Sequence, residues 1–149
     1  MKRTLRFLGL STLLLGVAVM AAEEGKLEGI KCPVSGQPVK AEHTVAYAKA
    51  EVYFCCPNCP KAFKENTAKF TEKANKQLVQ TEQYVQKACP LAGRPVKVKA
   101  GENPEVGFCC ENCLGKYNDA SDEEKLKLVF AKAPFEKGFE LKKKEESKE

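Results

Sequence analysis

Eight cysteines, the residues of this chain best suited to chemistry, fall into two groups of four. The groups are Cys32, Cys55, Cys56 and Cys59, and Cys89, Cys109, Cys110 and Cys113. In the first group 22 residues separate the first two cysteines, in the second group 19, and three residues then separate the second cysteine from the last in both. A short turn can direct two sulfurs at one ion while a distant segment supplies more. The spacing therefore indicates a small metal site built twice.

The residues around the cysteines are duplicated as well. Residues 32–40 read Cys-Pro-Val-Ser-Gly-Gln-Pro-Val-Lys, and residues 89–97 read Cys-Pro-Leu-Ala-Gly-Arg-Pro-Val-Lys. The clusters at 54–59 and 108–113 both begin Phe-Cys-Cys and both end Asn-Cys. No cysteine of the sequence lies outside these frames. Two equal metal sites require such matched copies, whereas a disulfide framework has no need of them.

The number of sulfurs in each site decides which ion it suits. Four thiolates close a tetrahedron, the geometry of structural Zn²⁺, whereas three suit a soft ion such as Cu⁺ or leave one position open. Neighbouring residues on a strand face opposite ways, so Cys55 and Cys56 can share an ion only if the chain turns there, which Pro57 favours. We expect one ion per unit, Zn²⁺ or alternatively Cu⁺ or another soft metal, with all eight cysteines as candidate ligands.

Two other interpretations of the cysteines stay open. An even number of cysteines in a small exported chain is typical of structural disulfides. Residues 56–59 also have the Cys-x-x-Cys form of thiol–disulfide exchange sites. No βαβ pattern surrounds this motif, and Glu111 places an anion beside Cys110 in the second copy, where it disfavours a thiolate. The alternative to metal binding is therefore a thiol–disulfide redox protein or a disulfide-stapled interaction protein.

The segments that must position the cysteines predict a turn and a hairpin in each unit. Proline and glycine exclude a helix at 32–38 and 89–95 and favour a tight knuckle that leads into a strand. Four short apolar segments are expected to be strands: 45–48, 52–54, 96–98 and 106–108. Each pair of strands lies between the knuckle and the cysteine cluster, so the hairpin brings the two together.

Helical patterns follow each cysteine cluster. In the first unit we predict helices at 61–66 and 67–77, and in the second unit a capping-box pattern at 121–124 precedes an apolar segment. Phe63 and Tyr117 both stand four residues beyond the last cysteine and are expected to cap the sites with apolar surface. The sequence thus predicts a small α+β protein of two tandem treble-clef-like or zinc-knuckle units, each a β-hairpin followed by a helix.

The Cys-Pro-x-x-Gly opening, the aromatic residue before each cluster and the cysteine spacing resemble the TRASH and YHS families of small metal-binding modules. Those families are associated with the trafficking, resistance and sensing of heavy metals. The resemblance implies two ligand triads, Cys32, Cys55 and Cys59, and Cys89, Cys109 and Cys113. Cys56 and Cys110 depart from the usual pattern, in which another residue often stands at this place.

The two units set the expected domain boundaries. Unit one is predicted at 30–74 and unit two at 87–133, with a connecting segment at 75–86 and a charged tail at 134–149. Each unit is so small that its hydrophobic core alone is expected to give little stability, so a metal or another cross-link is needed. His43 is the only histidine, and the aligned residue of unit two is Ala100, so we interpret His43 as an exposed loop residue.

The first residues have the composition of a secretory signal peptide at 1–22. Three basic residues precede 16 uncharged ones at 7–22, fewer than the roughly 20 needed to span a bilayer, and small residues end the stretch. We expect cleavage, an exported (periplasmic or secreted) location and a mature protein that does not span the membrane. Its formal charge would fall from +5 to +2, and with positive and negative charges so nearly balanced we expect no nucleic-acid binding.

No feature of the sequence predicts an enzyme. With one histidine, a Ser/His/Asp set cannot be duplicated, and no glycine-rich phosphate loop follows a predicted strand. The expected partners are the metal ion itself and a second exported or membrane protein that handles metal.

Overall fold

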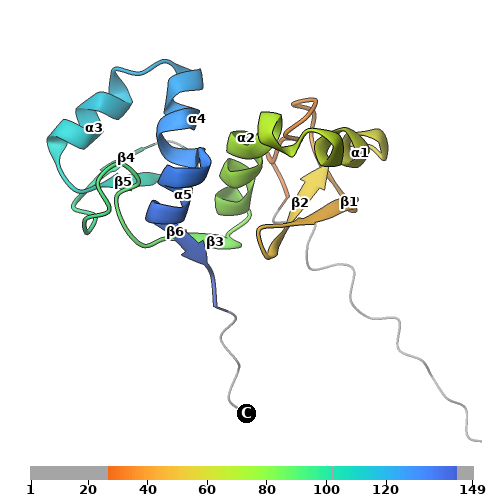
Figure 1. Cartoon of the computed structure of the whole chain (residues 1–149), viewed down its shortest axis with the longest axis horizontal. Helices are drawn as coiled ribbons and strands as arrows, with labels where there is room; N and C mark the ends of the chain where they lie inside the picture. The colour runs from red at the N-terminus through yellow and green to blue at the C-terminus, as the bar shows by residue number, and fades with distance from the viewer. Residues whose placement is uncertain (1–26, 102, 144–149) are drawn as a thin grey trace, which may run out of the picture.

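The computed structural model describes residues 27–101 and 103–143. In chain order the elements are β1 (Lys40–Tyr47), β2 (Ala50–Phe54), α1 (Asn58–Glu65), α2 (Thr67–Gln80), β3 (Tyr84–Gln86), β4 (Val98–Ala100), β5 (Val106–Phe108), α3 (Glu111–Asn118), α4 (Asp122–Phe130), α5 (Lys132–Gly138) and β6 (Phe139–Leu141). The strands form three antiparallel pairs, β1–β2, β4–β5 and β3–β6. The predicted class, a small α+β protein with hairpins followed by helices, is confirmed (Figure 1).

The first unit places a hairpin against two helices. The predicted strands are confirmed as parts of β1 and β2, except that β1 begins earlier, at Lys40, and ends at Tyr47, which leaves Ala48 in the turn. The predicted helices are confirmed as α1 and α2, although α1 begins earlier, at Asn58, and ends before Asn66, and α2 continues to Gln80. Phe63 of α1 is buried and its ring lies 5.4 Å from that of Phe54 and 5.5 Å from that of Tyr47, centroid to centroid. These aromatic contacts hold α1 over the hairpin.

The second unit repeats this arrangement with shorter strands. The strand at 106–108 is confirmed as β5, but β4 begins at Val98 rather than at Val96. Val96 instead packs its side chain on Gly107, where a Cβ would collide with it. The capping-box segment is confirmed at the start of α4, where the Glu124 carboxylate accepts hydrogen bonds from the Ser121 backbone N–H at 2.9 Å and the Ser121 hydroxyl at 2.7 Å.

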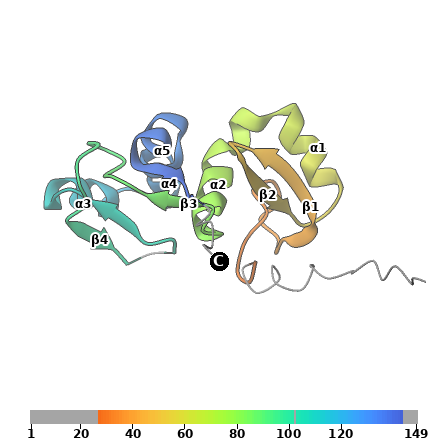
Figure 2. The same cartoon turned by 90° about the horizontal axis from the view of Figure 1, so that it is seen from below.

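The two units share one hydrophobic core. Helix α2 lies between the first hairpin and α4, as two perpendicular views show (Figures 1 and 2). Leu78 of α2 and Val129 and Phe130 of α4 are buried in the same cluster as the residues around both cysteine groups. The Asn75 side-chain amide also donates a hydrogen bond to the Phe130 carbonyl at 2.8 Å. The units therefore pack closely.

Two segments outside the predicted units contribute to the core. The expected connecting segment 75–86 contains the C-terminal part of α2, residues 75–80, and strand β3. The expected charged tail 134–149 contains most of α5 and all of β6, and residues 144–149 lie outside the described part. Phe139 is 2% exposed and stacks on Phe130 and Phe135 at centroid distances of 5.8 and 5.2 Å. Two phenylalanines among many charges are thus enough to anchor this segment.

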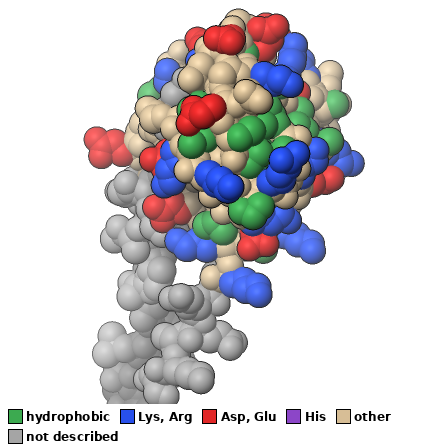
Figure 3. Space-filling view, turned by 90° about the vertical axis from the view of Figure 1, so that its left-hand side faces the viewer, with side chains coloured by type: hydrophobic (Ala, Val, Ile, Leu, Met, Phe, Trp, Pro, Cys, Tyr) green, Lys and Arg blue, Asp and Glu red, His purple; other side chains and the backbone are tan. Residues whose placement is uncertain are grey.

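The described surface carries mixed charge. The view onto the side of α3 shows cationic and anionic side chains interspersed, with hydrophobic side chains between them (Figure 3). Within residues 27–101 and 103–143, no helix is long and apolar enough to cross a membrane. The predicted signal peptide at 1–22 lies outside the described residues.

Candidate metal centres

The knuckles that carry the first cysteine of each group have the same backbone. The Gly36 N–H donates to the Cys32 carbonyl at 2.8 Å, and the Gly93 N–H donates to the Cys89 carbonyl at 2.7 Å. The cysteine N–H groups donate in turn to the carbonyls five residues on, at 2.8 and 2.9 Å. Gly36 and Gly93 have φ angles of 75° and 68°, a region that favours glycine. The duplicated glycine is therefore a requirement of the turn.

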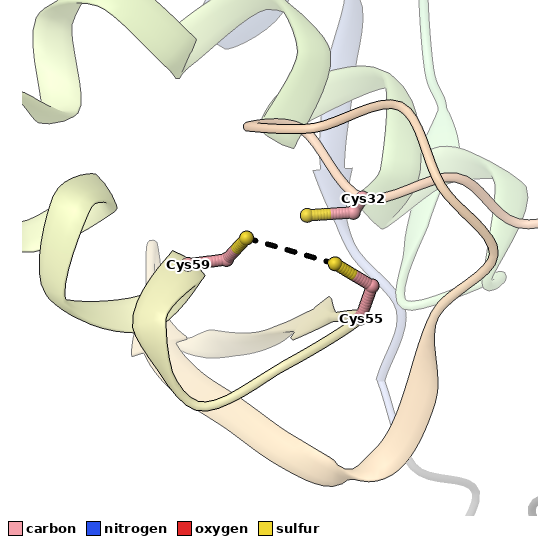
Figure 4. A group of neighbouring side chains, drawn as sticks. All are labelled: Cys32, Cys55 and Cys59. Atoms are coloured by element: carbon pink, nitrogen blue, oxygen red, sulfur yellow. Dashed lines mark hydrogen bonds between the residues drawn. The ribbon is translucent and has the colours of Figure 1, made fainter.

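The hairpin brings the other two cysteines of each triad to the knuckle. In the first unit Cys55 follows the end of β2, and Cys59 lies in the first turn of α1. Their Sγ atoms are 3.6 Å apart, and the Sγ atom of Cys32 completes a group in which all three lie within 4.8 Å of one another (Figure 4). The three side chains come from separate elements and point toward one centre.

The second unit repeats the triad. Cys89, Cys109 and Cys113 have Sγ atoms within 4.8 Å of one another, and those of Cys109 and Cys113 are 3.8 Å apart. An ion held at a metal–sulfur distance of about 2.3 Å separates its sulfurs by about 3.8 Å in a tetrahedron and about 4.0 Å in a trigonal plane. A disulfide bond is only about 2.05 Å long. The sulfur spacing therefore fits an ion, and all eight cysteines are free thiols.

Cys56 and Cys110 lie beside the triads. The Cys56 Sγ atom is 3.5 Å from that of Cys59, and the Cys110 Sγ atom is 3.7 Å from that of Cys109. The chain turns after Cys56, where Pro57 is helical (φ −68°, ψ −14°), while Cys110 is extended and exposed. Each sulfur thus lies at the rim of its triad, in contact with triad thiols, but the compact groups that could hold an ion do not include Cys56 or Cys110.

The thiols of the first triad differ in how readily they ionise. Burial raises the pKa of Cys32, but hydrogen bonds from the Ser35 hydroxyl and nearby backbone N–H groups outweigh it and lower this pKa to about 7. Burial raises the pKa of Cys59 far above its usual range, and the neighbouring thiols raise it further. The triad therefore combines a readily formed thiolate with a thiol that resists ionisation. A bound cation counters that resistance because it binds deprotonated sulfur.

The second triad shows the same contrast between a knuckle thiol of lowered pKa and a helix thiol of raised pKa, but without a serine hydroxyl. Burial raises the pKa of Cys89, but backbone N–H groups, first that of Ala92, outweigh burial and lower it. Burial and the thiols of Cys110 and Cys109 raise the pKa of Cys113 to about 12. In the first unit the Ser35 hydroxyl also lies 3.1 Å from the Cys55 sulfur. Ala92 stands at the equivalent place in the second unit and has no hydroxyl to offer.

Other singled-out residues lie apart from the sulfurs. His43 lies in β1 rather than in a loop, with its side chain 21% exposed and its Nε2 atom 3.4 Å from a Glu42 carboxylate oxygen. Among the described residues, the groups that could hold a metal do not include His43. The Tyr117 ring packs on that of Phe108 with centroids 5.0 Å apart, as Phe63 does on Phe54. Both aromatics therefore support the strand that leads into the cysteine cluster.

Two glutamines lie near the triads, and the sequence alone gives no sign of their structural role. Gln77 of α2 is 1% exposed and Gln86 of β3 is half-buried, and both side chains bond to the backbone around a triad. Both stand among other polar residues, and they do not align in the duplicated frame, since one follows its triad and the other precedes it. Only the folded chain brings them to equivalent places.

Comparison with protein-family models, with curated proteins and with solved structures finds no match for this chain. The conclusion that stands on the geometry is that two clusters of three cysteines could each bind a metal ion.

Proposed function

We propose that this chain is an exported metal-binding protein that holds one thiophilic ion at each cysteine triad. The observation that carries the proposal is the duplication: the same three sulfurs, on the same knuckle, strand end and helix turn, lie within 4.8 Å of one another twice. A chance approach of thiols in one unit would have no reason to recur in the other. The proposed ligands are Cys32, Cys55 and Cys59 at the first site and Cys89, Cys109 and Cys113 at the second.

Three sulfurs favour a soft ion. Cu⁺ is satisfied by three thiolates, whereas Zn²⁺ needs a fourth donor. Cys56 and Cys110 lie close enough to the triads, 3.5 and 3.7 Å from one member each, to become that donor after a local adjustment. We therefore propose a three-thiolate site for Cu⁺ and a four-thiolate site, with these cysteines added, for Zn²⁺.

The biological setting follows from the sequence features. The basic and apolar start of the chain supports export, and the resemblance to TRASH and YHS modules supports a role in metal trafficking or sensing, with treble-clef-like units. We propose no catalytic activity. The proposed partner is another exported or membrane protein that gives or takes the ion, since a triad at the end of a hairpin with a thiol at its rim is open to ligand exchange.

The test is the metal content and the free-thiol count of protein purified under anaerobic, reducing conditions. We expect two ions per chain and, after chelation, eight thiols that react with a thiol reagent. The ions should be released only as thiols are modified, because the same sulfurs hold them. A metal-free protein that takes up no added Zn²⁺ or Cu⁺ would overturn the proposal.

Thiol–disulfide exchange is the second candidate, favoured by the 3.5 Å approach of the Cys56 and Cys59 sulfurs. The backbone N–H of Cys59 lowers the pKa of Cys56, as a helix start does at thiol exchange sites. This candidate predicts one reversible disulfide per unit and no bound ion. Titration of the purified protein against a glutathione redox buffer, followed by mass spectrometry, distinguishes the two candidates.

A further inference from the structure

A buried glutamine joins the two parts of the first site. The Gln77 Oε1 atom accepts a hydrogen bond from the Tyr53 N–H at 2.7 Å. Its Nε2 atom donates to the Tyr53 carbonyl at 2.9 Å and to the Lys31 carbonyl at 3.1 Å. Tyr53 stands two residues before Cys55, and Lys31 immediately precedes Cys32. We call this three-bond contact a glutamine bridge.

The second site has the same bridge. The Gln86 Oε1 atom accepts a hydrogen bond from the Gly107 N–H at 2.7 Å. Its Nε2 atom donates to the Gly107 carbonyl at 2.7 Å and to the Ala88 carbonyl at 2.9 Å. Gly107 stands two residues before Cys109, and Ala88 immediately precedes Cys89. Both bridges therefore connect the same two backbone positions.

The glutamines themselves come from unrelated places. Gln77 lies on α2, which follows the first hairpin, whereas Gln86 lies on β3, which precedes the second knuckle. Duplication of one ancestral frame does not explain the match, because the two side chains occupy different elements. What the two side chains share is the pair of segments that they connect. One is the strand that ends in the cysteine cluster, and the other is the residue that precedes the knuckle cysteine.

We propose that Gln77 and Gln86 are positioning residues that set the separation of the knuckle cysteine from the other two thiols of each triad. This inference rests on the proposed function, since its consequence is metal affinity. In the first unit the isolated bridge between Lys31 and Pro38 closes the knuckle on itself and does not tie it to β2, the strand that precedes Cys55. A side chain that grips both segments limits the movement of the buried sulfur, and groups that orient metal ligands in this way are worth about 10–100-fold in affinity.

Gln83 provides a matched control within the same chain. Its Oε1 atom accepts from the Glu51 N–H at 2.7 Å, and its Nε2 atom donates to the Glu51 carbonyl at 2.7 Å and to the Thr81 hydroxyl at 2.8 Å. It thus pairs with the N–H and the carbonyl of one strand residue, as Gln77 and Gln86 do, but none of its hydrogen bonds reaches a knuckle. Gln83 and Gln86 are both half-buried and lie three residues apart, so their replacement perturbs similar surroundings.

The experiment compares Gln86→Leu and Gln83→Leu in the full chain loaded with ¹¹³Cd²⁺. The unmodified protein should give two ¹¹³Cd resonances, which Cys89→Ser assigns to their sites. We expect Gln86→Leu to shift the resonance of the second site and weaken that site at least about tenfold, or about 1.4 kcal/mol, with the first site unchanged. Gln83→Leu should leave both sites within about twofold. Equal effects of the two substitutions, or unchanged affinity in Gln86→Leu, would overturn the proposal.

A metal-free measurement separates this inference from the proposed function. The Cys89 thiol is 0% exposed, so its alkylation in the ion-free protein reports opening of the knuckle, while exposed Cys110 serves as the internal reference. We expect Gln86→Leu to accelerate alkylation of Cys89 at least about fivefold relative to Cys110. If the unmodified protein binds no ion, the proposed function fails, and an unchanged Cys89 rate would then overturn the bridge as well. Should Gln86→Leu not fold, Gln86→Asn, whose amide is too short to reach both carbonyls, is measured in the same way.

Discussion

The two cysteine triads have the same frame but are supported from different parts of the chain. The first knuckle is bridged from α2. The second knuckle is held from the C-terminal end, where the Gly138 carbonyl accepts hydrogen bonds from the N–H groups of Lys87 and Ala88 at 2.8 and 3.1 Å. Gly138 also packs so closely on Pro90 that a Cβ would lie 3.0 Å from its Cα atom. A duplicated site therefore does not require a duplicated scaffold, and each triad should respond to its own support.

Removal of a knuckle cysteine should have the largest effect and should separate the sites most clearly. We expect Cys32→Ser and Cys89→Ser each to abolish one of the two bound ions, with more than about a 100-fold loss at the altered site, because orienting groups alone are worth about 10–100-fold. Metal titration of the full chain measures this. With Cu⁺ as the titrant the control is Cys110→Ser, which removes an exposed thiol that the proposed three-thiolate site does not use. Loss of both ions from either single substitution would show that the sites are not independent.

Gly138→Ala should damage the second site and spare the first. The added Cβ must move the backbone of Pro90, which follows Cys89, and overpacking of this kind costs about 1–3 kcal/mol of unfolding free energy. Denaturant unfolding and site-resolved metal titration measure the two consequences. Gly115→Ala is the matched control, because a Cβ there meets no atom within 4 Å and alanine favours the helix. Equal weakening of both sites by Gly138→Ala would contradict the separate supports.

The pH dependence of affinity should show how the first triad is charged before an ion binds. Because the pKa of Cys32 is lowered to about 7, this thiol is ionised above pH 7 and protonated below it. Binding therefore displaces one more proton below about pH 7 than above it, and the affinity of the first site should fall more steeply there, by about an extra tenfold per pH unit. Competition with a chelator between pH 6 and pH 8 measures the slopes. A constant slope would contradict the lowered pKa of Cys32.

Exchange of Ser35 and Ala92 should have the smallest effect and should test the one polar difference between the knuckles. Ser35→Ala removes a hydroxyl that lowers the pKa of Cys32 and lies 3.1 Å from the Cys55 sulfur. We expect the first site to weaken by about two- to tenfold near pH 7, the equivalent of a typical hydrogen bond of about 0.5–1.5 kcal/mol. Ala92→Ser should strengthen the second site by a similar or smaller factor. Isothermal titration of the reciprocal pair measures both, and opposite signs would refute this role of the hydroxyl.

The sequence predicted the features whose residues repeat along the chain, and it missed the contacts that leave no repeated pattern in the sequence. The paired glycines at 36 and 93 and the cysteine spacing define the knuckles, and alternating apolar residues define the hairpins, because these depend on local geometry. The bridges of Gln77 and Gln86 depend on tertiary contacts across 24 and 21 residues, which no local pattern records. Strand β6 was missed for the same reason, since Phe139 stands among charged residues and its burial depends on stacking against Phe130 and Phe135.

The most direct test of the central claim is X-ray absorption spectroscopy of the full chain loaded with two equivalents of Cu⁺. Three triad sulfurs at each site predict a first shell of about three sulfur scatterers at a single distance near 2.3 Å and no nitrogen or oxygen donors. Loading of only one equivalent, or a first shell dominated by nitrogen or oxygen, would contradict the account.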